Sequence, residues 1–334
     1  MPTLPSPHSP ARGVGVERGP LPEGTTPPAA RPTRSPLRGV LLYCVALLLF
    51  ACLDTATKYL TTYYPVPLVS WSRYALQLVL MTAVLAPTVG RQIALPTRPA
   101  PVVLRSLCLV LTSIFVGLAL RRLPVAEASA IVFLSPLLVV LLAGPLLGER
   151  LTPGRAALAG LGFVGVLLIA RPGGNLDALG VFFALLGAAS NTGYQLLSRV
   201  LSAEPPLTLL FNSALVGVLT LGPLLPFFWK GPPLTPLYAG LFLALGLMAG
   251  LGHFLLTLGF RYAPASLISP VTYLQLVWAG LLGWLVFRHI PDALSLCGMA
   301  VIAGAGVATV VTGRPRGNSQ PSAVSRQPSA KDGG

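Results

Sequence analysis

The segment 121–171 constrains the fold of this chain most, because it holds two apolar stretches of membrane-spanning length in immediate succession. The stretches 124–147 and 153–170 contain 24 and 18 residues. A helix needs about 20 apolar residues, at about 1.5 Å each, to cross a hydrocarbon core of about 30 Å. The segment therefore predicts two antiparallel transmembrane helices. The elbow between them is Gly148, Glu149, Arg150, Leu151, Thr152 and Pro153.

A comparable pattern returns in the segment 261–310, where the elbow is 287–292. Shifted by 139 residues, Arg122 aligns with Arg261 and Gly144 with Gly283. The shared order of these landmarks indicates an internal duplication.

The composition fits a membrane protein, since 54% of the residues are hydrophobic and 10% are charged. The net charge of +14 lies mostly in the tails and at the ends of apolar spans. This distribution follows the positive-inside rule and predicts a lipid bilayer as partner, not nucleic acid. The four cysteines lie inside apolar spans without metal-ligand spacing, so we expect packing residues and no bound metal.

Ten apolar spans are predicted, near 38–61, 67–87, 101–120, 124–147, 153–171, 177–200, 206–228, 235–260, 264–287 and 291–312. The predicted fold is an all-α integral membrane protein with ten transmembrane helices in two inverted five-helix repeats, because an odd number of spans reverses the second repeat. We place the repeats at 37–173 and 174–313, between disordered tails at 1–36 and 314–334. We expect both termini on the cytoplasmic side of a bacterial-type inner membrane. The arginines counted on that side are Arg91, Arg98, Arg105, Arg150, Arg155, Arg199 and Arg261.

Four charged side chains fall inside the predicted spans of the first repeat: Asp54, Lys58, Arg73 and Glu127. A charge at the centre of a span costs about 2.5–3.5 kcal/mol, so these groups should pair or face water. Asp54 and Lys58 share a helix face, and Arg73 is expected to reach Glu127 or Asp54. In the alternative interpretation, Lys58 and Arg73 extend to the outer surface and Glu127 caps its helix. The first interpretation predicts a hydrated cavity with both signs of charge, suited to an amphoteric solute.

The second repeat has neutral side chains at the equivalent positions. These are Asn191, Gln195 and Asn212, with Ser266 or Leu267 opposite Glu127.

Four further positions are candidates near the centre of the spans. His253 is a candidate proton relay, with a hydrogen-bonded packing role as the alternative. Tyr273 and Gln275 are expected to line the central cavity. Pro136 should kink its helix and is a candidate gate.

The sequence contains no glycine-rich phosphate loop after a strand, no paired histidine ligands, and no nucleophile with a base nearby in sequence. We therefore predict that the protein is not an enzyme and uses no cofactor.

The chain resembles the EamA-type ten-helix carriers of the drug/metabolite transporter superfamily. The resemblance covers about 38–312 and rests on DTATKYL, LRRLPVAEASAIVFLSPLL, LLGERLTPGRAALAGLGFVGVLLIARPGG and PASLISPVTYLQLVWAGLLGWLVF. It implies a central substrate cavity and alternating access. The family's second repeat usually carries a Gly-Glu pair where this chain has Arg288 and His289, which puts any role for that acidic residue in doubt here.

The predicted function is secondary transport of a small polar or amphoteric metabolite, amino-acid-like or S-adenosylmethionine-like, across the cytoplasmic membrane. A coupling proton or counter-solute, and a homodimer, are left open. The alternatives are a non-transporting membrane scaffold or sensor on the same fold, a channel, and a multidrug or metabolite efflux carrier.

Overall fold

The computed structural model describes residues 36–147, 152–171, 176–229, 231–263, 267–268 and 271–312. Within these residues every element of regular secondary structure is helical. The first repeat contains α1 (Pro36–Tyr63), α2 (Val66–Val89), the 3₁₀ turn Gly90–Ala94, α3 (Pro99–Arg122), α4 (Val125–Val132), α5 (Ser135–Leu147) and α6 (Pro153–Ala170). The second contains α7 (Ala178–Val200), α8 (Pro206–Leu221), the 3₁₀ turn Gly222–Leu224, α9 (Leu225–Phe228), α10 (Pro236–Tyr262), α12 (Leu274–Phe287) and α13 (Ala293–Thr312).

Five helical segments in the described parts of the chain are long and apolar enough to cross a membrane: Pro36–Tyr63, Pro99–Arg122, Val125–Leu146, Pro206–Phe228 and Pro236–Tyr262. Shorter apolar helices occupy Ala156–Ala170, Leu274–Phe287 and Ala293–Thr309. With α2 and α7, and with α4 joined to α5 and α8 to α9, these described helices form ten bundle segments. The predicted all-helical membrane fold is confirmed. The elbow residues 148–151, Ser266 and the two predicted tails beyond Pro36 and Thr312 lie outside the described residues.

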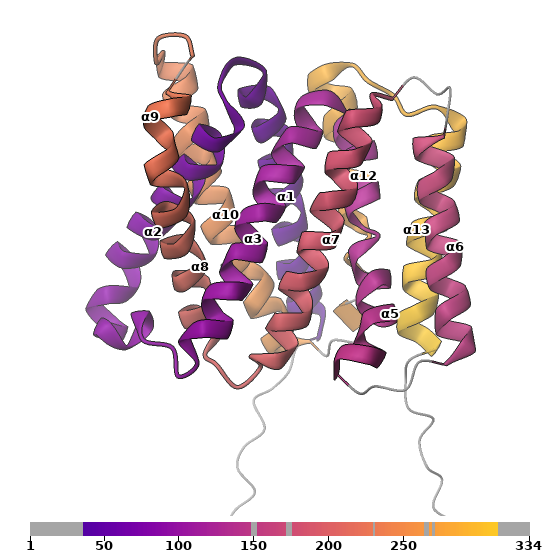
Figure 1. The fold of residues 1–334 in the computed structure, drawn as a ribbon, viewed down its shortest axis with the longest axis horizontal. Coiled ribbons are helices and arrows are strands. Elements are labelled where there is room, and N and C mark those ends of the chain that lie inside the picture. The colour runs from indigo at the N-terminus through magenta and orange to yellow at the C-terminus, as the bar shows by residue number, and fades with distance from the viewer. Residues whose placement is uncertain are drawn as a thin grey trace, which may run out of the picture. The chain divides into compact units, whose positions relative to one another are not determined.

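Helix packing follows the symmetry expected of inverted repeats. The helix α1 packs along α10, and its counterpart α7 packs along α3; α6 packs along α13 (Figure 1). The two repeats correspond through a shift of five bundle segments. This shift makes α7 the counterpart of α1, and α3 the counterpart of α10, so the α1–α10 and α7–α3 pairs are equivalent. The helices α6 and α13 are counterparts of each other, and they form one pair. The two repeats are therefore interlocked, and their interface runs through the centre of the bundle.

Both repeats contain a broken helix at equivalent positions. The turn Phe133–Leu134 separates α4 from α5, and the turn residues Thr272 and Tyr273 precede α12. The two turns are 139 residues apart (272 − 133 = 139), which is the shift that aligns the two halves of the sequence.

The helix is distorted close to Pro136, but the break itself lies just before this proline, at Phe133–Leu134. Proline has no N–H to bond the carbonyl four residues before it, so the carbonyl of Val132 loses its helical partner. Ser135 Oγ donates to this carbonyl instead. The helix consequently breaks between Val132 and Ser135, and Pro136 lies in the first turn of α5.

The helix α3 runs through the bundle, and its ends define two edges, which we call the Pro99 edge and the Arg122 edge. At the Arg122 edge, Arg122 Nη1 donates to Asp177 Oδ2 at 3.0 Å, just before α7 begins. At the Pro99 edge, the backbone N–H groups of Thr97 and Arg98 donate to the Glu204 carboxylate at 3.2 and 2.9 Å, just after α7 ends. These bonds join the α3–α7 pair at both ends.

Candidate translocation cavity

A cavity of about 1100 Å³ lies between the repeats and is lined by residues from both. Exposed lining residues, Arg199 and Phe260 among them, lie near the Pro99 edge. In the other direction the lining ends at Thr57 on α1 and Leu120 on α3, and Leu120 is fully buried. The cavity therefore reaches the surface near the Pro99 edge and is closed toward the Arg122 edge. Eight candidate residues from the sequence line it: Asp54, Arg73, Pro136, Asn191, Gln195, His253, Tyr273 and Gln275.

Two polar contacts at the broken helices connect the repeats. Asp54 Oδ2 on α1 accepts a hydrogen bond from Gln275 Nε2 on α12 at 3.4 Å. Asn191 Nδ2 on α7 donates to Ser135 Oγ on α5 at 3.2 Å. In each case the first helix of one repeat contacts the N-terminal turn of the broken helix in the other. Such discontinuous helices are where secondary carriers place their binding sites.

Arg73 lies in the same cavity, with its guanidinium carbon 4.4 Å from the centre of the Tyr74 ring. Its Nη2 donates to Ser113 Oγ at 2.5 Å, and Tyr74 Oη lies 2.6 Å from the same oxygen. The buried Nε atom has no hydrogen-bond partner among the described residues. The expected ion pair of Arg73 with Asp54 or Glu127 is not present within 4.0 Å in the described part of the chain.

Arg105 is a cavity residue that the sequence interpretation counts only among the arginines of the cytoplasmic side. It lies in the second turn of α3, is 4% exposed, and lines the cavity. Its Nε donates to Ser198 Oγ at 2.7 Å, and its Nη1 donates to Ser213 Oγ at 3.0 Å. Its Nη2 donates to Tyr194 Oη at 2.9 Å, and its guanidinium carbon stacks 4.4 Å from that ring. The serine and tyrosine content of α7 and α8 near the Pro99 edge was the available sequence signal.

Lys58 faces a second, smaller pocket of about 230 Å³ at the Arg122 edge. Its Nζ donates to the backbone carbonyls of Leu120 and Leu123 at 2.8 and 2.7 Å. These carbonyls belong to the last turn of α3 and to its C-cap residue, Leu123, where helical partners are missing and a cation is favoured by the helix dipole. Lys58 therefore separates the two pockets, since Leu120 lines the large cavity and Leu123 lines the small one.

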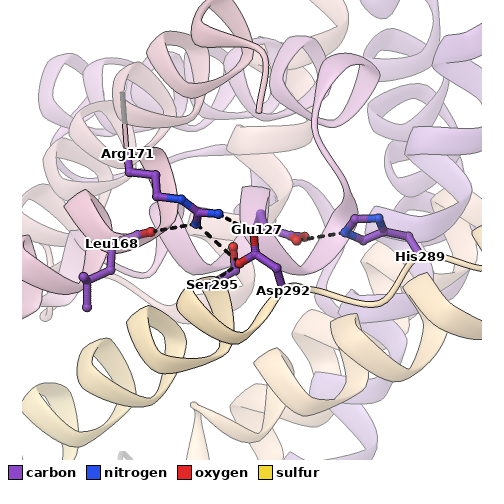
Figure 2. Close-up of polar contacts among 6 residues, drawn as sticks. All are labelled: Glu127, Leu168, Arg171, His289, Asp292 and Ser295. Carbon is purple, nitrogen blue, oxygen red and sulfur yellow. Dashed lines mark hydrogen bonds and ion pairs between the residues drawn. The ribbon is translucent and has the colours of Figure 1, made fainter. Parts of the chain in front are cut away.

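Glu127 lies in the first turn of α4, and its side chain is 2% exposed. Its Oε1 pairs with His289 Nε2 at 2.9 Å, and its buried Oε2 has no partner in the described structure. The expected contact with Arg73 is therefore wrong. Glu127 lies beside the Arg122 edge, where the elbow 287–292 of the second repeat covers it (Figure 2).

The same elbow forms a second ion pair with the first repeat. Arg171 Nη2 lies 2.5 Å from Asp292 Oδ2, and the backbone N–H of Ser295 donates to Asp292 Oδ1 at 2.8 Å (Figure 2). The Arg171 guanidinium, followed by the Ser295 bonds, holds the pKa of the Asp292 carboxyl well below its usual range. Asp292 is therefore ionised at neutral pH.

Asn212, like Lys58 and Glu127, is a predicted residue that does not line the large cavity. It is buried, and its Nδ2 donates to the backbone carbonyl of Thr208 in its own helix at 2.9 Å. The described residues bring no three His, Cys, Asp or Glu side chains together in a group that could hold a metal ion.

Comparison with known proteins identifies two matches to the EamA-like transporter family, at residues 37–171 and 178–312. A pseudopaline exporter from Pseudomonas aeruginosa is 28% identical over 278 residues, which cover 81% of this chain and 95% of the relative. An S-adenosylmethionine uptake transporter from Rickettsia bellii is 28% identical, covering 79% of this chain and 90% of the relative. A riboflavin transporter from Rhizobium johnstonii is 31% identical, covering 56% of this chain and 62% of the relative. A solved crystal structure superposes with a TM-score of 0.60 at 25% identity, covering 82% of this chain and 97% of the other.

Proposed function

We propose that this chain, which belongs to the EamA-like transporter family, carries a small polar or amphoteric metabolite across the cytoplasmic membrane by alternating access. The observation that carries the proposal is the cavity of about 1100 Å³ that both repeats line, with Asp54 of one repeat bonded to Gln275 of the other. A solute bound there touches both repeats. Its binding free energy therefore acts on their relative arrangement.

The closed Arg122 edge supplies the gate in this proposal. Two contacts join the first repeat to the elbow 287–292 of the second: Glu127 to His289, and Arg171 to Asp292. The α3–α7 pair is bonded at both edges and moves as one unit. In the alternate state the elbow contacts break, Lys58 leaves the α3 carbonyls, and the small pocket joins the cavity. The same motion closes the Pro99 edge.

The cavity favours an amphoteric solute because Asp54 provides a negative group and Arg73 a positive one. Its volume of about 1100 Å³ lies slightly above the range of pockets for drug-sized ligands, about 300–1,000 Å³, so it has room for a solute larger than a single amino acid. The relatives named for pseudopaline export and for S-adenosylmethionine and riboflavin uptake suggest the class of small organic metabolites.

We further propose that the Pro99 edge faces the cytoplasm, and that the repeats divide between residues 173 and 174. A reporter enzyme that works only in the cytoplasm should then be active when it is fused after the last residue. Activity of a periplasm-dependent reporter at the same position would refute this orientation.

Counterflow in proteoliposomes tests the transport proposal irrespective of direction. Vesicles loaded with unlabelled S-adenosylmethionine, or with riboflavin, should accumulate the labelled compound through the wild type for at least one of the two. Asp54→Asn and Arg73→Ala should reduce the exchange, whereas Arg38→Ala, an exposed arginine near the start of α1 that stacks on Tyr262, should not. No exchange by the wild type with either compound would favour a scaffold or sensor. Unchanged exchange by Asp54→Asn and Arg73→Ala would remove those residues from the pathway.

A further inference from the structure

The cavity lining has more positive than negative side chains, and the positive side chains differ in whether a negative group lies near them. In the described lining, Asp54 is the one carboxylate, whereas three arginines bring guanidinium groups: Arg73 and Arg105 inside the cavity, and Arg199 at its exposed mouth. Arg73 shares the cavity lining with the Asp54 carboxylate. The hydrogen-bond acceptors of Arg105 are hydroxyl and backbone carbonyl oxygens, none of which is charged.

A buried guanidinium with only neutral acceptors keeps its full positive charge in a place of low dielectric constant. Burial of an unpaired charge is unfavourable, and an anion that binds beside it recovers much of that cost. Four of the five N–H groups of Arg105 donate to these neutral acceptors, so one N–H on Nη2 remains for an oxygen of a bound carboxylate. The neutral bonds to Ser198, Ser213 and Tyr194 hold the guanidinium in one orientation without neutralising it.

Arg105 lies at a different depth in the cavity from Asp54 and Arg73, as measured along α3. Ser113, which bonds Arg73, is eight residues further along α3, or about 12 Å at 1.5 Å per residue. Arg105 therefore lies nearer the Pro99 edge, where the cavity reaches the surface, and Asp54 lies deeper. A dipolar solute can place its anionic end at the first group and its cationic end at the second.

We propose that Arg105 binds a carboxylate of the transported solute and so selects metabolites that carry a carboxylate in addition to a cationic group. Arg105 is a specificity-determining residue in this proposal, which rests on the proposed transport function. The bound carboxylate accepts from the guanidinium of Arg105, and the cationic group of the solute faces Asp54.

Thermal stabilisation of the purified full chain tests this with matched compounds that differ in one group. The carboxylate pairs are S-adenosylmethionine with its decarboxylated analogue, and a lysine-containing dipeptide with its C-terminal amide. Riboflavin 5′-phosphate with riboflavin forms the phosphate pair. In the wild type, the carboxylate member of at least one pair should bind at least about tenfold more tightly than its partner. In Arg105→Gln this ratio should fall to about one, and Arg105→Lys should retain part of it.

Arg98→Gln is the matched control, because Arg98 is an exposed arginine just before the same helix and does not line the cavity. It should leave the ratio unchanged. Equal stabilisation by both members of each carboxylate pair in the wild type, or a ratio that survives in Arg105→Gln, would overturn the proposal. A preference confined to riboflavin 5′-phosphate would also overturn it and identify a phosphate site. Counterflow distinguishes failure of the transport proposal from failure of the Arg105 proposal. Exchange by the wild type without a preference for the carboxylate compound would retain the transport function and reject the role of Arg105.

Discussion

Removal of the His289 side chain should open the Arg122 edge. In His289→Ala the buried Glu127 carboxylate loses the hydrogen bond of 2.9 Å to its Oε1, and its Oε2 already has no partner in the described structure. A buried charged group left without a partner costs about 1–3 kcal/mol or more. The His289 side chain is 38% exposed, so water replaces part of the lost bond. We therefore expect a shift of about 1.5 kcal/mol toward the state in which Glu127 reaches water, or about tenfold in the ratio of the two states.

Thiol labelling measures this shift. Thr57→Cys places a reporter at the closed end of the cavity, in a background where the four native cysteines, all free, are replaced by serine. Labelling by a membrane-impermeant reagent from the Arg122 side should be about tenfold faster in His289→Ala than in the parent protein, if labelling follows the open population.

Two further variants control this experiment. Arg122→Gln removes an ion pair at the same edge whose side chains are 42% and 40% exposed, so it should change labelling little. The double variant Glu127→Leu with His289→Ala should return toward the parent rate, because the unpaired charge is gone. Unchanged or slower labelling in His289→Ala, or an equal effect of Arg122→Gln, would refute the reasoning.

Three other predictions concern packing and electrostatics. Gly298→Ala should destabilise the fold by about 1–3 kcal/mol, because its Cβ would lie 2.5 Å from the Gly165 carbonyl oxygen at the α6–α13 contact. Gly304→Ala on the same helix meets nothing within 4 Å, so it should leave the melting temperature unchanged or raise it slightly. Lys58→Met should leave the Leu120 and Leu123 carbonyls without their donor, lower the melting temperature and raise Thr57→Cys labelling, whereas Lys58→Arg should preserve both. The hydrogen bond from Thr97, together with the backbone N–H bonds, lowers the pKa of the Glu204 carboxyl in the folded protein. The ionised carboxylate therefore stabilises the fold at pH values above the ordinary glutamate pKa of about 4.3. This stabilisation is lost as the pH falls through the lower pKa of the folded state. The difference in melting temperature between wild type and Glu204→Gln should be constant from about pH 6 to 8 and shrink below about pH 4; a difference that grows on acidification would contradict the assignment.

The fold was predictable because hydropathy and duplication are properties of the chain in order. The shift of 139 residues that aligns Arg122 with Arg261 also relates the two helix breaks, at Phe133 and Thr272. The predicted span at 153–171 is α6, Pro153–Ala170.

The partners of the charged side chains were not predictable, because they depend on how each helix is rotated and on which loop covers its end. Glu127 meets His289, 162 residues away in sequence, through the folding of an elbow over α4. Arg105 lies near the start of the predicted span 101–120 and counts there only as a cytoplasmic-side charge, yet the packing of α7 and α8 against α3 encloses it. Asn212, the equivalent of Arg73 in the second repeat, has a shorter side chain, and it donates a hydrogen bond to the Thr208 carbonyl of its own helix.

Reversible cross-linking across the Arg122 edge tests alternating access between the two repeats most directly. Glu127→Cys and His289→Cys, in the cysteine-free protein, would be joined by a short bifunctional thiol reagent, and counterflow would be measured with a labelled solute that the unlinked double variant exchanges. If the edge must open in each cycle, cross-linking stops exchange and reduction restores it. Exchange that continues at the unlinked rate while the two sites are joined would contradict the account.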